Sequence, residues 1–230
     1  MITLYHFGDA FGFDPSPFCL KMETYLRLAG HPFQKKRGDL RKAPKRQLPV
    51  IEDDGKVVAD SRFIIEYLKA KHGNPLDGRL SATEMASLHA WQRMIEESLY
   101  WTIVYSRWID DAGWTVFRPL VFGFLPGPLK TIVPPLIRRR VARTLNGQGT
   151  LRHSPEEIYA LGLRDVAALS GLLGDRPYML GDKPTSLDAS AAGSLINILH
   201  APLETPLKTG TAKHANLVAY ADRIRERLKG

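Results

Sequence analysis

Cysteine is almost missing from this chain of 230 residues, which contains only Cys19. A single cysteine excludes an intramolecular disulfide and is typical of proteins in a reducing compartment. No run approaches the roughly 18–20 apolar residues that are needed to cross a bilayer. Residues 1–6 also lack a basic region followed by an apolar stretch, so we expect no signal peptide. These absences predict a cytoplasmic protein without a membrane span.

Motifs for binding metals and phosphates are lacking as well. The seven histidines show no metal-ligand spacing in combination with cysteine, and we therefore expect no metal site. No glycine-rich loop of the phosphate-binding type is present. The candidate chemistry of the chain therefore rests on side chains and helix termini.

Acidic residues are too few to balance the basic ones, and the formal net charge is +8. The excess lies in two segments, residues 35–46 and 130–143, while the remainder carries a small net negative charge. Neither segment contains aromatic residues on which nucleic-acid bases would stack. Two separate basic spots fit small anionic ligands or solvated surface, so we expect no nucleic-acid partner.

Strand-like and helix-like segments alternate over residues 1–74. Short apolar or alternating runs predict four strands, at residues 2–7, 33–37, 48–52 and 56–59. The turn Asp53-Asp54-Gly55 joins the last two as a hairpin. Ser16-Pro17 and Asp60-Ser61 predict two helix starts, because serine and aspartate cap helices and proline suits the first helical position. With a short helix expected before the third strand, the order is β-α-β-helix-β-β-α.

Only helical patterns follow a linker at residues 74–80. Capping motifs open three of the helices, at Ser81–Glu84, Ser154–Glu157 and Thr185–Asp188. A final helix is predicted over Ala215–Lys229. Residues 116–136 are apolar but contain five prolines, which predicts a broken connection and not a continuous helix. We therefore predict two domains, an α/β domain over residues 1–74 and an all-helical domain over residues 81–230.

Three features of the first domain suit one kind of ligand. Ser16 stands at a helix start, whose unpaired N–H groups and partial positive charge favour an anion such as a thiolate. A hydroxyl hydrogen bond and the helix end together are expected to lower a thiol pKa by about one to three units. Leu48-Pro49-Val50 has the pattern of a cis proline that presents backbone groups, and Asp60-Ser61 is a second helix start that suits a carboxylate. Taken singly, each feature is more typical of an ordinary cap or turn.

The order and spacing of these features resemble those of the glutathione transferase family, and more narrowly of its branch related to failed axon connections proteins and metaxins. The first-domain motifs are Ser16-Pro-Phe-Cys19, Ala43–Ile51 and Ala59-Asp-Ser61. The second-domain motifs are Arg93–Glu97, Tyr105-Ser-Arg-Trp108, Gly147-Gln-Gly149, Arg152–Glu157 and Leu180–Asp188. The resemblance implies a thioredoxin-like domain with a mixed four-stranded sheet, an all-helical second domain, a homodimer and a role in detoxification.

The resemblance also implies site residues. Ser16 corresponds to the hydroxyl that supports the glutathione thiolate in serine-type transferases. Pro49 corresponds to the family's cis proline, so that the backbone of Val50 would pair with the cysteinyl unit of glutathione. Asp60 and Ser61 correspond to the residues that hold the γ-glutamyl group. One departure is the loop between Phe7 and Ser16, which is longer than is usual in the family.

Other residues are candidates for binding the glycine end of glutathione or the second substrate. Lys45, in the first basic segment, or Gln47, directly after it, would reach the glycine end of glutathione. Tyr105 and Trp108, with their neighbours Tyr100 and Trp101, would line a pocket for an apolar co-substrate or pack in the core. Tyr5, in the first strand, is an alternative thiolate partner or a packed aromatic residue at the rim of the site.

The leading hypothesis is an enzyme that conjugates glutathione to an electrophilic apolar small molecule, with glutathione as the co-substrate and no metal. A first alternative is a non-catalytic module that binds glutathione or other proteins, since a fold does not fix an activity. A second alternative is a thiol oxidoreductase or peroxidase that uses Cys19. Because Cys19 lies one turn into its helix, it is also typical of an inert buried cysteine.

Overall fold

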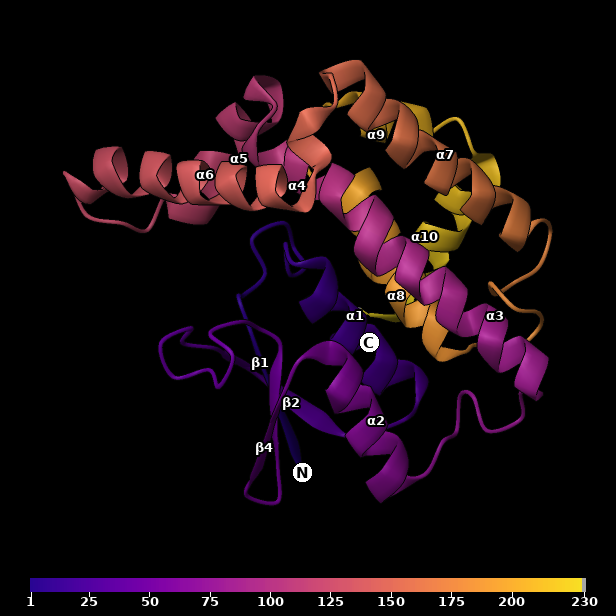
Figure 1. The fold of residues 1–230 in the computed structure, drawn as a ribbon. Helices are drawn as coiled ribbons and strands as arrows, with labels where there is room; N and C mark the ends of the chain where they lie inside the picture. The colour runs from indigo at the N-terminus through magenta and orange to yellow at the C-terminus, as the bar shows by residue number, and fades with distance from the viewer. Residues whose placement is uncertain (229–230) are drawn as a thin grey trace.

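The computed structural model describes residues 1–228 as a sheet-containing part beside a larger assembly of helices (Figure 1). The four strands lie in the order β2-β1-β3-β4, with bounds Ile2–His6 (β1), Phe33–Arg37 (β2), Val50–Asp53 (β3) and Lys56–Ala59 (β4). Strands β1 and β2 are parallel, while β3 is antiparallel to both β1 and β4. The mixed four-stranded sheet predicted from the sequence is therefore confirmed.

Two helices belong to the sheet-containing part, and both begin at the predicted caps. Helix α1 spans Pro17–Leu28 with Ser16 as its N-cap, and helix α2 spans Ser61–His72 with Asp60 as its N-cap. The short helix expected before β3 was predicted wrongly. Residues 39–46 form turns instead, in which the backbone N–H groups of Lys42 and Ala43 both donate to the carbonyl of Asp39.

The helical part contains ten helical segments within residues 1–228. Their bounds are Ala82–Arg93 (α3), Met94–Leu99 (η1, a π-helix), Tyr100–Trp108 (α4), Asp111–Phe122 (α5), Leu129–Gln148 (α6), Thr150–Arg152 (η2), Pro155–Leu173 (α7), Ser186–Leu199 (α8), Pro206–Thr211 (α9) and Ala215–Arg227 (α10). The capping boxes predicted at Ser81, Ser154 and Thr185 are present. Lys229, the predicted end of the last helix, lies outside the described residues.

The proline-rich segment corrects one expectation. Instead of a broken connection, it contributes most of α5 and the first part of α6, with a gap only at residues 123–128. A proline inside a helix removes one hydrogen bond and frees the carbonyl four residues earlier. Pro119 frees the carbonyl of Thr115, and Pro134 and Pro135 free those of Lys130 and Thr131. All three of these residues are exposed, so water can satisfy their carbonyls.

The two parts meet where α8 packs against α1. Gly193 of α8 lies so close to the first turn of α1 that a Cβ there would stand 2.4 Å from the carbonyl oxygen of Pro17. A buried ion pair joins the same surfaces, since Lys21 Nζ of α1 lies 2.6 Å from Glu96 Oε1 of η1. The start of α1 is therefore fixed by the helical part as well as by the sheet. No helix within residues 1–228 is long and apolar enough to cross a membrane.

Candidate functional site

A cavity of about 960 Å³ lies between the start of α1 and the helices α4 and α5. The sheet-containing part contributes residues of the segments 7–17 and 37–41, and Ser16 is among them. The helical part contributes a mainly apolar wall of Tyr100, Ile103, Val104, Arg107, Trp108, Phe117, Leu120, Val121, Phe122 and Phe124. The cavity therefore has the start of α1 on one side and apolar side chains on the other.

Ser16 is the N-cap of α1, and its hydroxyl can both accept and donate a hydrogen bond. Its Oγ accepts a hydrogen bond from the backbone N–H of Cys19 at 3.3 Å, and the hydroxyl also carries a proton that it can donate. Pro17 has no N–H, and the N–H of Phe18 belongs to the helix end that has no partner within the helix. A hydroxyl donor and the positive end of a helix therefore stand together at the cavity wall, which favours a bound anion.

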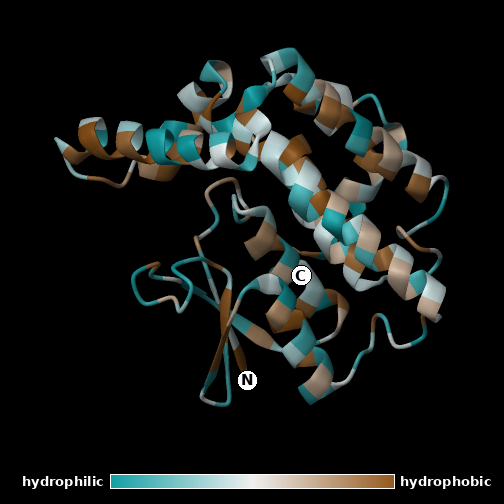
Figure 2. Cartoon of the chain, in the orientation of Figure 1, coloured by the Kyte–Doolittle hydropathy of each residue, from teal (hydrophilic) through white to brown (hydrophobic). Residues whose placement is uncertain are grey.

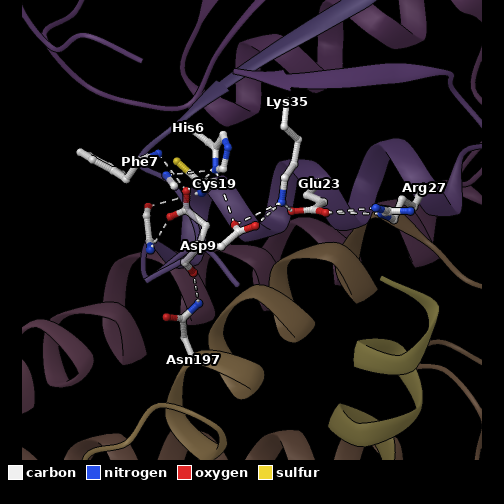
Figure 3. A network of polar contacts seen from close by, with 11 residues as sticks. His6, Phe7, Asp9, Cys19, Glu23, Arg27, Lys35 and Asn197 are labelled. Carbon is white, nitrogen blue, oxygen red and sulfur yellow. Dashed lines mark hydrogen bonds and ion pairs between the residues drawn. The ribbon is translucent and has the colours of Figure 1, made fainter. Parts of the chain in front are cut away.

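The long loop before α1 is held by a buried carboxylate, Asp14. Its partners include His6, Phe7 and Asn197, which are labelled in Figure 3. Its Oδ1 accepts the backbone N–H of Ser16 at 2.7 Å, and its Oδ2 accepts that of Phe7 at 2.9 Å. The Oδ2 atom also lies 2.9 Å from His6 Nδ1. Asn197 of α8 donates to the backbone carbonyl of Asp14 at 3.2 Å. The departure from the usual loop length therefore does not leave Ser16 loosely placed, because Asp14 fixes its backbone directly.

Arg107 of α4 is a buried cation that also lines the cavity. Its guanidinium donates to the carbonyl of Pro15 at 2.6 Å, and to the carbonyl and Oδ1 of Asn197 at 2.6 and 2.9 Å. These partners are neutral oxygens, and no carboxylate of the described residues forms an ion pair with Arg107. Burial lowers its pKa to about 10, which still leaves it charged at neutral pH. The apolar cavity consequently has a positive charge in its wall.

Tyr100 lies beside this charge. Its ring packs on that of Phe18 with the centroids 4.8 Å apart, and the residue lines the cavity. Burial raises the pKa of its phenol, so the hydroxyl stays protonated at neutral pH. Within residues 1–228 this hydroxyl has no hydrogen-bond partner. It is therefore a neutral donor available to a molecule in the cavity.

The start of α2 forms a polar edge close to α1. Asp60 adopts a left-handed backbone conformation with φ +79° and accepts the N–H of Arg62 at 3.0 Å. Lys45 Nζ lies 3.6 Å from Asp60 Oδ2 and 4.2 Å from the centre of the Phe63 ring. Gln47 is exposed in the turn segment that leads into β3. This edge thus combines a helix N-terminus, a carboxylate and a cation.

Ser61 is buried, and its Oγ accepts a hydrogen bond from Lys21 Nζ at 3.2 Å. Lys21 is itself buried and paired with Glu96, which also accepts from Ser190 Oγ at 2.8 Å and from Arg62 Nε at 3.1 Å. Burial lowers the pKa of Lys21, and the contact with Glu96 opposes that shift. This network fixes the first turn of α2 against α1 and η1.

The peptide bond between Leu48 and Pro49 is cis, as the resemblance implies. Val50 follows as the first residue of β3, opposite Tyr5 of β1 and Ala59 of β4. The side chains of Val50, Ala59 and Cys19 pack in one small cluster. The sheet therefore gathers Val50, the start of α2 and the first turn of α1 at one edge of the fold.

Two family models match this chain. One is described as the glutathione S-transferase N-terminal domain and matches residues 17–113, and the other as the C-terminal domain and matches residues 162–224. An isoprene-epoxide–glutathione S-transferase of Rhodococcus sp. (strain AD45) is 39% identical over 234 residues, which cover 98% of each protein.

The chain belongs to the glutathione S-transferase family.

It is accordingly an enzyme of the transferase type. Failed axon connections of Drosophila melanogaster is 33% identical over 92% of this chain and 54% of that protein, and mouse Metaxin-1 is 29% identical over 89% and 68%. Among solved structures, a glutathione S-transferase from Rhodospirillum rubrum has a TM-score of 0.62 at 17% identity, covering 98% of this chain and 88% of that chain. That structural likeness shows the fold. The resemblance found in the sequence, including its branch, is confirmed.

The aromatic candidates of this transferase separate in the structure. Trp108 lines the cavity, whereas Tyr105 is buried in the helical core with its ring centre 5.6 Å from that of Tyr159. The hydroxyl of Tyr5 donates to Glu52 Oε2 at 2.8 Å, and this hydrogen bond raises the pKa of the phenol. Neither Tyr5 nor Tyr105 is among the residues that line the cavity.

Cys19 has the environment of an unreactive thiol. It is 1% exposed, and burial raises its pKa well above the ordinary value. A thiol attacks as the thiolate, so both properties oppose redox chemistry at this position. Residues 1–228 also contain no group of histidine, cysteine and carboxylate side chains that could hold a metal ion.

Sequence reasoning missed three residues that shape the site, namely Asp14, Arg107 and Asn197. Asp14 and Asn197 are polar residues that occur within otherwise small or apolar stretches, as buried polar groups often do. Arg107 lies in the motif Tyr105-Ser-Arg-Trp108, where a charge interrupts an apolar helix face. This interruption is the signal in the sequence that could have identified Arg107.

Proposed function

We propose that this transferase conjugates the thiol of glutathione to a small apolar electrophile, with Ser16 stabilising the thiolate. The observation that carries the proposal is the cavity that has Ser16 and the start of α1 on one side and an apolar wall on the other. Enzymes gain most from donors that are already oriented toward a developing or resident charge. Ser16 meets that requirement, because Asp14 fixes its backbone and Cys19 its oxygen.

The rest of glutathione would lie along the polar edge described above. The backbone of Val50 would pair with the cysteinyl unit, and the start of α2 at Asp60 and Ser61 would hold the γ-glutamyl group. Ser61 supports this role, since its Oγ accepts from Lys21 and its own proton remains available to a carboxylate. Lys45 or Gln47 would reach the glycine carboxylate.

For the second substrate we propose a small apolar epoxide. The similarity to a protein named isoprene-epoxide–glutathione S-transferase supports this class, and so does the chemistry of the cavity. When the thiolate attacks an epoxide carbon, the C–S bond forms, the ring C–O bond breaks and the oxygen takes up a proton. Tyr100 is a protonated donor without a partner, and Arg107 stabilises negative charge nearby. Trp108 and Leu120 would contact the apolar part of the electrophile.

The wider setting is also proposed. Residues 1–74 and 81–230 would form two domains, and the enzyme would be a cytoplasmic homodimer with a role in detoxification.

A second candidate function is a non-catalytic module that binds glutathione or another protein. The similarity to Failed axon connections and Metaxin-1 supports it. The burial of Cys19 argues against the oxidoreductase alternative.

The decisive test is to incubate the purified protein with glutathione and a short aliphatic epoxide, and to detect the thioether product by mass spectrometry. Conjugation at neutral pH that is strongly reduced in Ser16→Ala and kept in Ser81→Ala, a matched change at another helix cap, is the expected result. Glutathione binding by calorimetry without turnover of epoxides, alkyl halides or enones would favour the non-catalytic module. Absence of glutathione binding would refute the transferase proposal and the glutathione-binding form of the module, and would leave only a module that binds another protein.

A further inference from the structure

Helices α5 and α6 form a hairpin that extends beyond the body of the molecule (Figure 1). Large apolar side chains are exposed along it, and apolar stretches are visible at its outer end (Figure 2). Phe124, in the turn, is 67% exposed, and Ile132 and Leu136 of α6 are 54% and 61% exposed. Surface apolar residues that occur singly need no explanation, but a continuous group of them marks an interaction site.

The exposed residues of α6 share one face of the helix. Leu129, Ile132 and Leu136 are spaced by three and four positions, the spacing of one helical stripe. The same stripe continues at Arg139, Arg140 and Arg143, all of which are exposed. Pro134 and Leu145, the buried residues of α6, lie on the opposite side of the helix. Helix α6 therefore presents an outward face that is apolar in its first half and basic in its second.

The charged residues of the hairpin are almost all basic. Residues 111–148 contain one lysine, five arginines and a single acid, Asp111. Asp111 pairs with Arg138 at 2.6 Å. Arg139, Arg140 and Arg143 form no ion pair with any of the described residues. Three cations on the outward face are therefore available to an anionic partner.

We propose that the outward face of the α5–α6 hairpin docks on the surface of a bilayer that contains anionic phospholipid. At a membrane interface, exposed apolar side chains enter the acyl boundary while clustered cations bind the anionic headgroups, and the outward face of α6 offers both kinds of side chain. A second copy of the chain is a poor occupant, because in a two-fold dimer the same face of the partner would offer no free carboxylate to Arg139, Arg140 and Arg143: the single acid of residues 111–148, Asp111, pairs with Arg138. The docking does not rest on the transferase activity.

The test is sedimentation of the full-length protein with vesicles of phosphatidylcholine alone and with vesicles that also contain phosphatidylglycerol. We expect binding only to the second kind and weakening as salt is added. Each arginine near an anionic surface contributes roughly a fivefold gain in partitioning, so replacing Arg139, Arg140 and Arg143 with glutamine should lower it about a hundredfold. The double variant Ile132→Asn with Leu136→Asn should lower it by about tenfold or more.

A charge-matched control replaces three exposed cations elsewhere, Arg164, Lys183 and Lys213, with glutamine, and should bind nearly as the unaltered protein does. All variants change exposed side chains outside the cavity, so circular dichroism and glutathione conjugation should be unchanged. Sedimentation with neither kind of vesicle, equal sedimentation with both, or full binding by the triple-glutamine α6 variant would overturn the proposal. So would a dimer in solution that Ile132→Asn with Leu136→Asn dissociates, because a second copy would then cover this face.

Discussion

The substitution Ser16→Ala tests the proposed activation of glutathione most directly. In the unaltered protein the Ser16 oxygen caps α1 by accepting from the backbone N–H of Cys19, and the hydroxyl proton would be donated to the bound thiolate. Alanine removes that proton donor and leaves the positive end of α1 in place. The change therefore separates the hydroxyl's contribution from that of the helix end.

The magnitude follows from the hydrogen bond that is lost. A hydrogen bond to a charged group contributes about 1.5–3 kcal/mol, and one pKa unit corresponds to 1.36 kcal/mol. The thiol of bound glutathione should thus titrate about one to two pH units higher in Ser16→Ala. At a pH below both values, the thiolate fraction and the rate of conjugation should fall about tenfold to a hundredfold. Above the higher pKa most of the rate should return.

The assay is a pH titration of the ultraviolet thiolate absorbance of the complex, together with the pH dependence of kcat/KM. Ser16→Thr keeps a hydroxyl and should restore the profile. Ser81→Ala is the control for capping, since losing a cap costs about 1 kcal/mol of stability while the thiol is untouched. A Ser16→Ala profile that overlays that of the unaltered protein would refute this role for the hydroxyl.

The remaining predictions concern the buried groups around the site. Cys19→Ala should retain conjugation, and in the native protein Cys19 should resist aromatic disulfide reagents until denaturant is added; rapid labelling would contradict its burial. Glu96→Gln should lower the unfolding free energy in urea by about 3–5 kcal/mol because it leaves Lys21 without a charged partner, whereas Glu96→Leu with Lys21→Met should lose less. Gly193→Ala should destabilise the protein by about 1–3 kcal/mol and weaken glutathione binding, because its Cβ would displace the first turn of α1. Gly171→Ala, on α7 with open space around it, should be neutral or stabilising, and equal effects at the two glycines would exclude the steric explanation.

Local signals in the sequence were sufficient for most of the fold. The caps Ser16, Ser81, Ser154 and Thr185 each depend on residues within one turn, and each predicted helix start is present. Strand β2 also has the predicted bounds, residues 33–37. The proline-containing helices α5 and α6 were not predictable in this way. Proline weakens a helix by an amount that solvent and packing can offset, and neither is visible in the sequence.

The residues of the candidate site also divide into those that local sequence predicts and those that it does not. The motif around Ser16 is local and was recognised, but the contacts that hold it are not local. Asp14 supports the Ser16 backbone within the loop, whereas Asn197 reaches the same loop from 183 residues away along the chain. The pair Lys21–Glu96 likewise joins positions 75 residues apart. Periodicity assigns such residues to a helix face, and only the packing of helix on helix determines which charges meet.

Arg107 contacts the loop that carries Ser16 and also lines the proposed electrophile site. Its guanidinium holds the carbonyl of Pro15, next to Ser16, and at the same time places a buried positive charge in the wall that would face the electrophile. A substitution of Arg107 would therefore disturb both the position of the thiolate and the potential felt by the electrophile. Trp108 and Leu120 line the same cavity without contacting the loop through hydrogen bonds. Electrophile preference should therefore be adjustable at these two positions while the binding and ionisation of glutathione stay intact, whereas changes at Arg107 should alter both together.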